Sequence, residues 1–250
     1  MGDFTGRVGA AVVLGANGGL GSAIAGELLR RGCVVALTYR TDATPLDDLA
    51  GNRAHAYRLD LTDSDACRAV VDRIAVDLNG IHTLVYAAGP HVPMTHLSRV
   101  APEAMRGQLD ADVAAFFNAV QPALPHLRAA RGNIVAVTTA ATSRFPIRDG
   151  LSSAPKAAIE ALVRALAVEE GRFGVRANCV GPGMLTDGMA ERLIRSGDLD
   201  ERALDAARGN IPLRRFGTAQ DIAEAVCFLA SDRAGFVSGQ KLDVDGGYGA

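Results

Sequence analysis

Short apolar runs alternate with longer amphipathic segments along almost the whole chain. Most of these runs are continuous rather than interrupted by polar residues, which is typical of strands buried on both faces. The runs predict strands at residues 9–15, 34–39, 55–61, 82–88, 133–139, 175–181 and 241–247. The amphipathic segments predict helices at residues 23–31, 64–78, 102–127 (one long helix or two) and 153–170.

Strands that alternate with helices predict parallel strands joined by right-handed crossovers. Short turns rich in Gly, Asp and Asn separate the predicted elements, and no linker, repeat or low-complexity segment interrupts them. We therefore expect an α/β fold, a doubly wound (Rossmann) parallel seven-stranded sheet with helices on both faces. Residues 1–250 are expected to form a single domain.

The composition and net charge of the chain argue against several classes of function. The chain has 250 residues, of which 48% are hydrophobic, and this is enough for one large core. Its net charge of −2 argues against nucleic acid or an anionic membrane as the main partner. No apolar run approaches the ~20 residues that span a bilayer, and no signal peptide is expected. The four cysteines are scattered without metal-ligand spacing, so we expect no metal site and a soluble cytoplasmic protein.

A glycine-rich turn, LGANGGLG at residues 14–21, follows the first predicted strand and opens the first predicted helix. Gly15, Gly19 and Gly21 allow a tight backbone turn and let a pyrophosphate approach without meeting a Cβ atom. The start of the helix adds free N–H groups and a partial positive charge. In this context the turn predicts a dinucleotide site.

The glycine spacing, G-x-x-x-G-x-G, resembles that of the short-chain dehydrogenase/reductase family. The similarity continues with Asp60 in RLDLTD, with the strand end YAAG at residues 86–89, and with the loop at residues 178–186. The tail, at residues 212–217 and 243–247, is similar to the 3-oxoacyl-carrier-protein reductase branch. The resemblance implies that a nicotinamide dinucleotide is bound by Gly15, Asn17, Gly19, Leu20, Gly21, Asp60, Leu61, Ala87, Ala88, Gly89, Lys156, Pro182, Gly183, Leu185 and Thr186.

The end of the second predicted strand indicates which cofactor to expect. An acid there would bond the ribose 2′-hydroxyl of NAD, whereas an arginine suits the 2′-phosphate of NADP. Arg40 stands at this position, so NADP(H) is favoured over NAD(H). The alternative is that Arg40 is a solvated surface residue and that Asp42 bonds the hydroxyl. Gly18 stands where many NADP-preferring relatives carry a second basic residue.

The family resemblance also implies a catalytic set. In the family a tyrosine protonates the carbonyl oxygen, and a lysine four residues later lowers the pKa of that tyrosine and holds the ribose. A serine orients the carbonyl and an asparagine supports a water relay. Position by position, Lys156 stands at the lysine, Ser152 at the tyrosine, Thr139 at the serine and Asp112 at the asparagine. Only the lysine is retained, so the set is degenerate.

The two most consequential replacements are Ser152 and Asp112. A serine hydroxyl is a far weaker acid than a phenol and reaches less far into the cleft. Two interpretations of Ser152 are open: a hydrogen bond to the substrate, or capping of the helix predicted to begin near residue 153. Asp112 is expected either to pair with Lys156 or to serve as an alternative proton source.

No second tyrosine is expected to replace the missing one. Enoyl-thioester reductases of the superfamily place a tyrosine seven residues before the lysine, where this chain has Asp149. Dienoyl-CoA reductases place one fifteen residues before it, where this chain has Ala141. His91 and His96, in the loop after the fourth predicted strand, are expected to be ordinary surface residues.

Two functions remain open. The first is an NADP(H)-dependent oxidoreductase that reduces a carbonyl or a conjugated enone or enoyl group of a small molecule, such as an acyl thioester or a polyketide-like ketone. The second is a non-catalytic NAD(P)-binding pseudoenzyme, or the partner subunit of a competent relative. Residues 186–210 are expected to form a substrate lid. Apolar positions at residues 159–168 are expected to support a homotetramer or homodimer.

Overall fold

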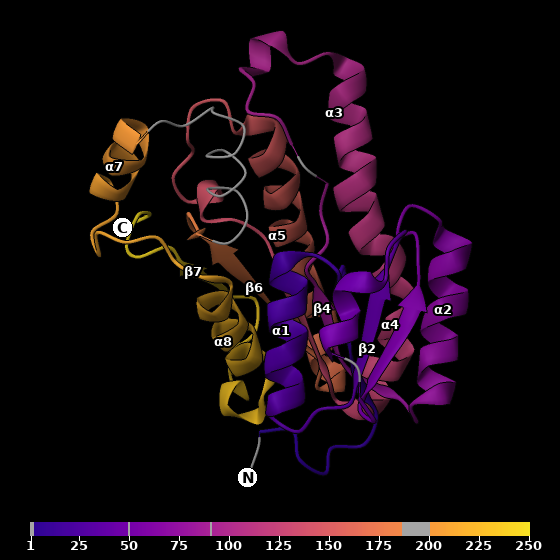
Figure 1. Ribbon diagram of the computed structural model, residues 1–250. Helices are drawn as coiled ribbons and strands as arrows, with labels where there is room; N and C mark the ends of the chain where they lie inside the picture. Colours follow the sequence, from indigo (N-terminus) through magenta and orange to yellow (C-terminus); the bar gives the residue numbers. More distant parts are fainter. Residues whose placement is uncertain (1–2, 50, 91, 187–200) are drawn as a thin grey trace.

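The computed structural model describes residues 3–49, 51–90, 92–186 and 201–250. A seven-stranded sheet lies at its centre in the order β3-β2-β1-β4-β5-β6-β7, and each pair of neighbours is parallel (Figure 1). The strands are β1 (Ala10–Leu14), β2 (Val35–Tyr39), β3 (Ala54–Arg58), β4 (Ile81–Tyr86), β5 (Asn133–Val137), β6 (Arg176–Pro182) and β7 (Lys241–Val244). The α-helices are α1 (Gly19–Arg30), α2 (Ser64–Asp77), α3 (Pro102–Leu109), α4 (Ala115–Ala130), α5 (Gly150–Glu170), α7 (Glu201–Gly209) and α8 (Ala219–Ala230).

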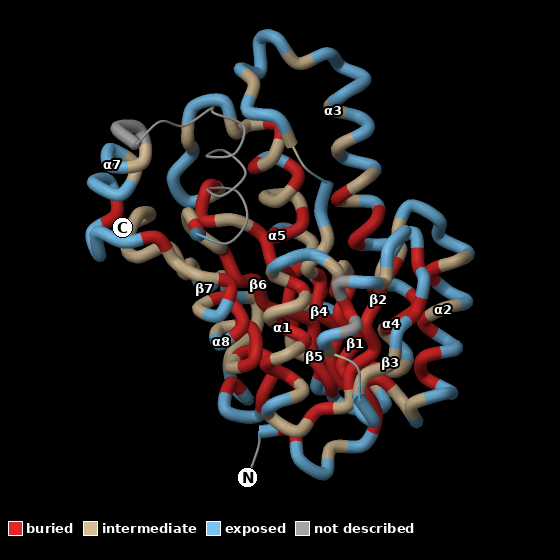
Figure 2. Tube along the Cα trace, in the orientation of Figure 1, coloured by how far each residue is buried: buried red, intermediate tan, exposed pale blue. Residues whose placement is uncertain are grey.

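Different helices cover the two faces of the sheet. On one face, Ile24 of α1 and Val226 of α8 join Val13 of β1 in one core cluster. On the other face, residues of α2, α4 and α5, such as Phe116, join Leu14 of β1 in a second cluster. Successive strand residues point to opposite faces, so every residue of β1 is buried, as its continuous apolar run predicts (Figure 2). The doubly wound single sheet is confirmed.

The helix that carries Lys156 begins earlier than predicted. Asp149 occupies the N-cap position of α5, and the helix starts at Gly150 rather than near residue 153. Ser152 therefore lies within the first turn and is not the cap, so the capping interpretation is wrong. The neighbouring Ser153 hydroxyl donates to the Asp149 carbonyl at 2.9 Å.

Other expectations about the helices are met only in part. The segment 102–127 forms two helices, α3 and α4, which a π-helical turn (Asp110–Ala114) separates. Of the apolar positions expected on an oligomer face, Ile159 and Val163 are instead buried in the core, whereas Val168 is exposed.

Among the described residues, no helix is long and apolar enough to cross a membrane. The same residues include no group of three or more His, Cys, Asp or Glu placed to hold a metal.

Candidate cofactor and active site

The motif residues lie on loops that leave neighbouring parallel strands at one edge of the sheet. Leu14 of β1 pairs with Tyr86 of β4, so the glycine turn and residues 87–89 leave the sheet side by side. Thr139 follows β5 and Gly183 follows β6, the next two strands in order. The strand order reverses between β1 and β4, and ligand crevices of such sheets form at this switch point.

The glycine turn brings backbone segments into close contact. A Cβ atom on Gly15 would lie 2.9 Å from the Cα of Ala88, and one on Gly21 would collide with the carbonyl oxygen of Gly15. Gly19, the first residue of α1, differs because no atom lies within 4 Å of the place its Cβ would take. The first N–H groups of α1 have no partner within the helix. This open, partly positive helix end fits the phosphates of a dinucleotide.

Arg40 and Asp60, the residues expected at the adenosine end of a bound dinucleotide, lie on the segments that follow β2 and β3. Arg40 is exposed directly after β2, and its guanidinium makes no ion pair with the described part of the chain. The Asp60 carboxylate accepts hydrogen bonds from the Thr62 amide at 3.0 Å and the Thr62 hydroxyl at 2.7 Å. These bonds, the amide first, and the charge of Arg40 hold the pKa of Asp60 below its ordinary value. Leu61, next to Asp60, accepts a hydrogen bond from Asn118 on its carbonyl.

Asp42, the alternative partner for a ribose hydroxyl, is engaged in its own turn. Its carboxylate accepts a hydrogen bond from the Thr44 amide at 2.9 Å, and this bond lowers the pKa of Asp42. Its carbonyl accepts a hydrogen bond from the Asn17 side chain at 3.3 Å. Asn17 therefore links the glycine turn to the loop after β2. The Asp42 carboxylate already accepts one hydrogen bond within its own turn.

Lys156 reaches from α5 to the end of β4. Its Nζ donates to the Ala88 carbonyl at 3.3 Å and to Asp112 Oδ1 at 2.9 Å. It also lies 3.2 Å from the place that a Cβ on Gly89 would take. The Lys156 side chain is 13% exposed and that of Asp112 is 1% exposed. Asp112 therefore forms a buried ion pair with Lys156, which is one of the two roles expected for it.

The two remaining hydroxyl residues are engaged differently. Thr139 Oγ1 accepts a hydrogen bond from the Ala141 amide at 3.1 Å. The Thr139 hydroxyl proton is not used in this bond and is left to donate to another acceptor. The Ser152 amide donates to the Asp149 carbonyl at 3.0 Å. Among the described residues, no side chain bonds the Ser152 hydroxyl, which is partly exposed. Each hydroxyl can therefore donate a hydrogen bond to an oxygen atom of a bound ligand.

Pro182 ends β6, and the loop that follows it folds against β7. The Gly183 amide donates to the Val244 carbonyl at 3.0 Å, and Leu185 is buried in the core. Thr186 bonds the Gly217 carbonyl through its amide at 2.9 Å and its hydroxyl at 3.3 Å. Residues 187–200 of the expected lid, and His91, lie outside the described residues, so the lid remains a prediction.

Tyr86 is the site residue that sequence reasoning missed. It had been matched only as part of the strand end, but its hydroxyl donates to Asp112 Oδ1 at 3.1 Å and lies 3.0 Å from the Asp112 carbonyl oxygen. Burial, and then the charge of Asp112, raise the pKa of Tyr86 well above its ordinary value, so the phenol stays protonated. The signal in the sequence was an aromatic residue at a position where the family carries asparagine.

Comparison with known proteins supports what the motifs imply. The family model described as enoyl-(acyl carrier protein) reductase matches residues 15–249. A cis-4-hydroxycyclohexanecarboxylate dehydrogenase from Sinomonas cyclohexanicum is 36% identical over the full length of both chains. A versicolorin reductase from Emericella nidulans is 30% identical over 95% of this chain and 94% of its own length.

A solved structure resembles this fold closely. The short-chain type dehydrogenase/reductase from Mycobacterium ulcerans superposes with a TM-score of 0.89 at 26% identity, over 98% of this chain and 90% of its own. The strand order, the glycine turn beside Ala88 and the lysine at the end of β4 agree with these likenesses. The chain therefore belongs to the short-chain dehydrogenase/reductase family of nicotinamide-dependent oxidoreductases.

Proposed function

We propose that the protein is an NADP(H)-dependent oxidoreductase that reduces a carbonyl or a conjugated enone or enoyl group without the usual tyrosine. The observation that carries this proposal is the position of Lys156. Its Nζ bonds the carbonyl of Ala88, and Ala88 packs directly against Gly15 of the glycine turn. In this proposal the glycine turn binds the phosphates, and the neighbouring Lys156 ammonium binds the ribose of the same dinucleotide.

Each residue of the site has a distinct role in this proposal. The bound nicotinamide supplies the hydride. Lys156 holds the ribose, while the Thr139 and Ser152 hydroxyls donate hydrogen bonds that orient the substrate oxygen. The Asp112 carboxylate is paired with Lys156 at 2.9 Å, so water is favoured over Asp112 as the source of the proton. Losing a tuned general acid typically costs about 10²–10⁴ in rate, so slow turnover is expected.

The choice of NADP(H) over NAD(H) rests on Arg40. Its exposed guanidinium follows β2, near the Asp60 carboxylate, and is suited to a 2′-phosphate. The competing carboxylate, Asp42, accepts a hydrogen bond from the Thr44 amide. These contacts support a phosphate rather than a free hydroxyl at this end of the crevice.

The names of the relatives support a substrate class. The matching family model is described as an enoyl-(acyl carrier protein) reductase, which supports an acyl thioester. The relative from Sinomonas cyclohexanicum is named for a ring-bound secondary alcohol, whose oxidation product is a cyclic ketone. We therefore propose thioester-linked or cyclic, polyketide-like carbonyl compounds as the substrates.

A homodimer or homotetramer is the proposed assembly. Leu109, Val113, Phe117 and Leu162 line an apolar groove between the π-helical region and α5. The Phe117 side chain is about half exposed there. An apolar groove of this kind supports burial against a second copy.

The second candidate function is a non-catalytic cofactor-binding subunit. It is favoured by the serine at the position of the proton donor and by the neutralised charge of Lys156. In this case the nucleotide would stabilise the fold, and a competent relative would be the partner. The two candidates differ in turnover, not in cofactor binding.

Fluorescence titration with NADPH and NADH, followed by turnover of a panel of ketones and enoyl thioesters, separates the candidates. We expect NADPH to bind more tightly than NADH and at least one panel member to be reduced. Tight binding without any turnover would favour the non-catalytic subunit. Absence of binding would contradict both.

Arg40→Asp tests the cofactor preference. Loss of a charge-assisted bond to the 2′-phosphate is expected to weaken NADPH by about tenfold or more and to leave NADH within about threefold. Arg53→Asp is the matched control, because Arg53 is exposed near the opposite end of the same strand pair. Equal effects of the two substitutions on NADPH would remove Arg40 from the phosphate site.

A further inference from the structure

Tyr86, Asp112 and Lys156 form one hydrogen-bonded row that crosses three elements. Asp112 Oδ1 accepts from Lys156 Nζ at 2.9 Å and from the Tyr86 hydroxyl at 3.1 Å. Lys156 Nζ also lies 5.3 Å from the centroid of the Tyr86 ring. Tyr86 is fully buried at the end of β4 and Asp112 is 1% exposed in the π-helical turn.

Two further contacts hold Tyr86 at one end of the row. Phe116 packs its edge against the Tyr86 ring, with centroids 5.2 Å apart and an interplanar angle of 83°. The Tyr86 hydroxyl lies 3.0 Å from the Asp112 carbonyl oxygen, so it contacts the backbone of the π-helical turn as well as the carboxylate. Tyr86 therefore contacts Asp112 through both its carboxylate and its backbone carbonyl.

The ion pair changes what Lys156 does to its surroundings. A free ammonium lowers the pKa of a nearby hydroxyl because it stabilises the ionised oxygen. An ammonium in contact with a carboxylate presents a dipole rather than a net charge, and its effect falls off faster with distance. The second lysine of the chain, Lys241, is likewise paired, with Asp243 at 2.9 Å.

We propose that Tyr86 and Asp112 are positioning residues that fix Lys156 at the end of β4 and neutralise its charge, so that Lys156 anchors a ligand without acidifying a hydroxyl at position 152. This inference deepens the proposed function, because it rests on Lys156 as the cofactor-holding residue. It also explains why serine suffices at position 152, where a phenol would gain no acidity from the lysine.

The proposal predicts a dependence between two substitutions. Ser152→Tyr alone is expected to introduce a phenol with an ordinary pKa near 10. Adding Asp112→Asn leaves the ammonium without its counter-charge, and the introduced phenol is then expected to titrate at least about one pH unit lower. Restoring the tyrosine is therefore expected to be insufficient on its own.

Ultraviolet titration of phenolate formation in the protein without cofactor measures this directly. Each spectrum is taken as a difference against its parent, wild type for the single variant and Asp112→Asn for the double variant, which cancels the natural tyrosines. A lower midpoint in the double variant supports the proposal, and coincident midpoints overturn it. Because no cofactor or substrate is present, this outcome is independent of whether the protein binds NADPH or turns over.

A second measurement tests Tyr86 and does not need the Asp112 variant to fold. The chain has only two lysines, Lys156 and Lys241, so lysine-labelled protein gives two side-chain resonances that Lys241→Arg assigns. Tyr86→Phe keeps the ring and removes the hydroxyl. We expect it to shift the Lys156 resonance and leave that of Lys241 in place, and to weaken NADPH binding several-fold. An unmoved Lys156 resonance would remove Tyr86 from the positioning role.

Discussion

At the scale of single residues, Asp149 is a partly buried carboxyl group whose pKa is shifted by burial alone. It precedes α5, three residues before Ser152, and contributes its carbonyl to the bonds from Ser152, Ser153 and the Ser153 hydroxyl. Its carboxylate makes no capping bond to the helix. Burial alone raises the pKa of Asp149 from 3.8 to about 6.

Asp149→Asn is expected to stabilise the protein in a pH-dependent way. Between pH 3.8 and about 6 the folded state binds more protons at this site than the unfolded state, so stability falls as the pH rises through that range. The variant escapes this loss, so its advantage is smallest below pH 3.8 and largest above about pH 6. Solvent screening of the partly exposed group reduces the effect to on the order of 1 kcal/mol.

Urea denaturation of the two proteins at several pH values measures the difference, with the exposed Asp110→Asn as control. An Asp149→Asn difference that is the same at every pH would show that the carboxyl group is not the cause.

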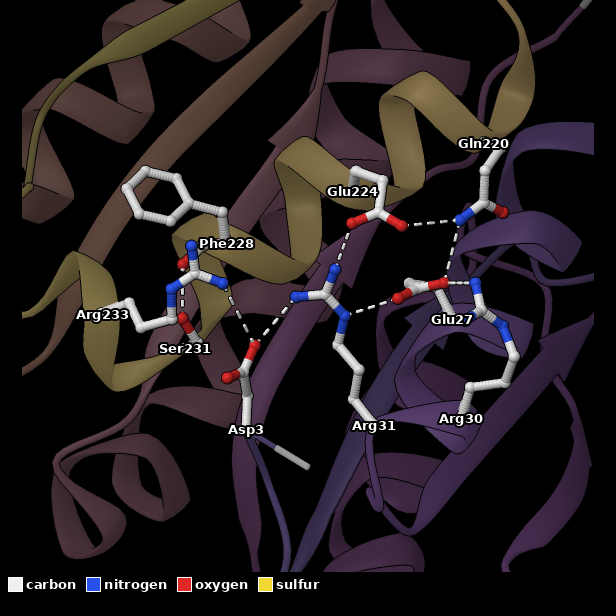
Figure 3. A network of polar contacts seen from close by, with 9 residues as sticks. All are labelled: Asp3, Glu27, Arg30, Arg31, Gln220, Glu224, Phe228, Ser231 and Arg233. Carbon is white, nitrogen blue, oxygen red and sulfur yellow. Dashed lines mark hydrogen bonds and ion pairs between the residues drawn. The ribbon is translucent and has the colours of Figure 1, made fainter. Parts of the chain in front are cut away.

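At the scale of elements, a charged network joins α1 to α8 and to the start of the chain (Figure 3). Glu27, with its side chain 2% exposed, accepts from Arg31 Nε at 2.5 Å and from the Gln220 amide at 2.9 Å, and it also pairs with Arg30. Arg31 in turn pairs with Asp3 at 2.8 Å and with Glu224. The buried carboxylate is therefore the centre of the network.

Glu27→Ala tests whether this network holds the two helices together. Removing the buried carboxylate leaves Arg30, Arg31 and Gln220 without a shared acceptor, and a loss of about 2–3 kcal/mol in the free energy of unfolding is expected. Glu224→Ala is the control, because Glu224 is half exposed and an exposed pair contributes less than about 1 kcal/mol. Chemical denaturation of both variants gives the comparison, and equal losses would contradict a special role for Glu27.

The same elements show how far the sequence predicts the fold. The predicted runs located all seven strands. The inner strands, such as β1 and β4, are continuous apolar runs because a strand buried on both faces admits few polar residues, whereas the edge strands β3 and β7 are mostly not buried and contain polar residues. Helix α8 was not predicted, although Thr218 and Asp221 form a capping box before its apolar face. The Asp112–Lys156 pair was one of two roles expected for Asp112, but the bond from Tyr86 was not, because Tyr86 and Asp112 meet only through tertiary packing.

At the scale of the whole molecule, the two edges of the sheet differ in polarity. The carboxyl edge carries the hydroxyls, the ion pair and the open helix end of the site. Near the amino edge, His82 of β4 is 1% exposed and packs at 6.2 Å against the Phe4 ring. Its Nδ1 lies 2.9 Å from Thr83 Oγ1 and its Nε2 lies 3.6 Å from Cys33 Sγ. Within the described part of the chain no acid pairs with the ring, and the charge of Arg7 further disfavours a positive charge on it. The folded state is therefore stabilised when the His82 imidazole is neutral and destabilised when it is protonated.

Stability is therefore expected to fall as the pH drops below the ordinary pKa of histidine. Burial lowers the pKa of His82 from 6.5 to about 3, so between these values the unfolded chain binds a proton that the folded protein does not. The free energy of unfolding is expected to lose about 1.4 kcal/mol per pH unit, or about 2 kcal/mol from pH 6.5 to 5. Thermal unfolding of wild type and His82→Leu across this range is the measurement, with His126→Asn as control, because the His126 ring is partly exposed beside Asp72. The loss of stability on acidification should be smaller in His82→Leu by this amount and unchanged in the control. An equal loss in both variants would assign the acid sensitivity to other groups.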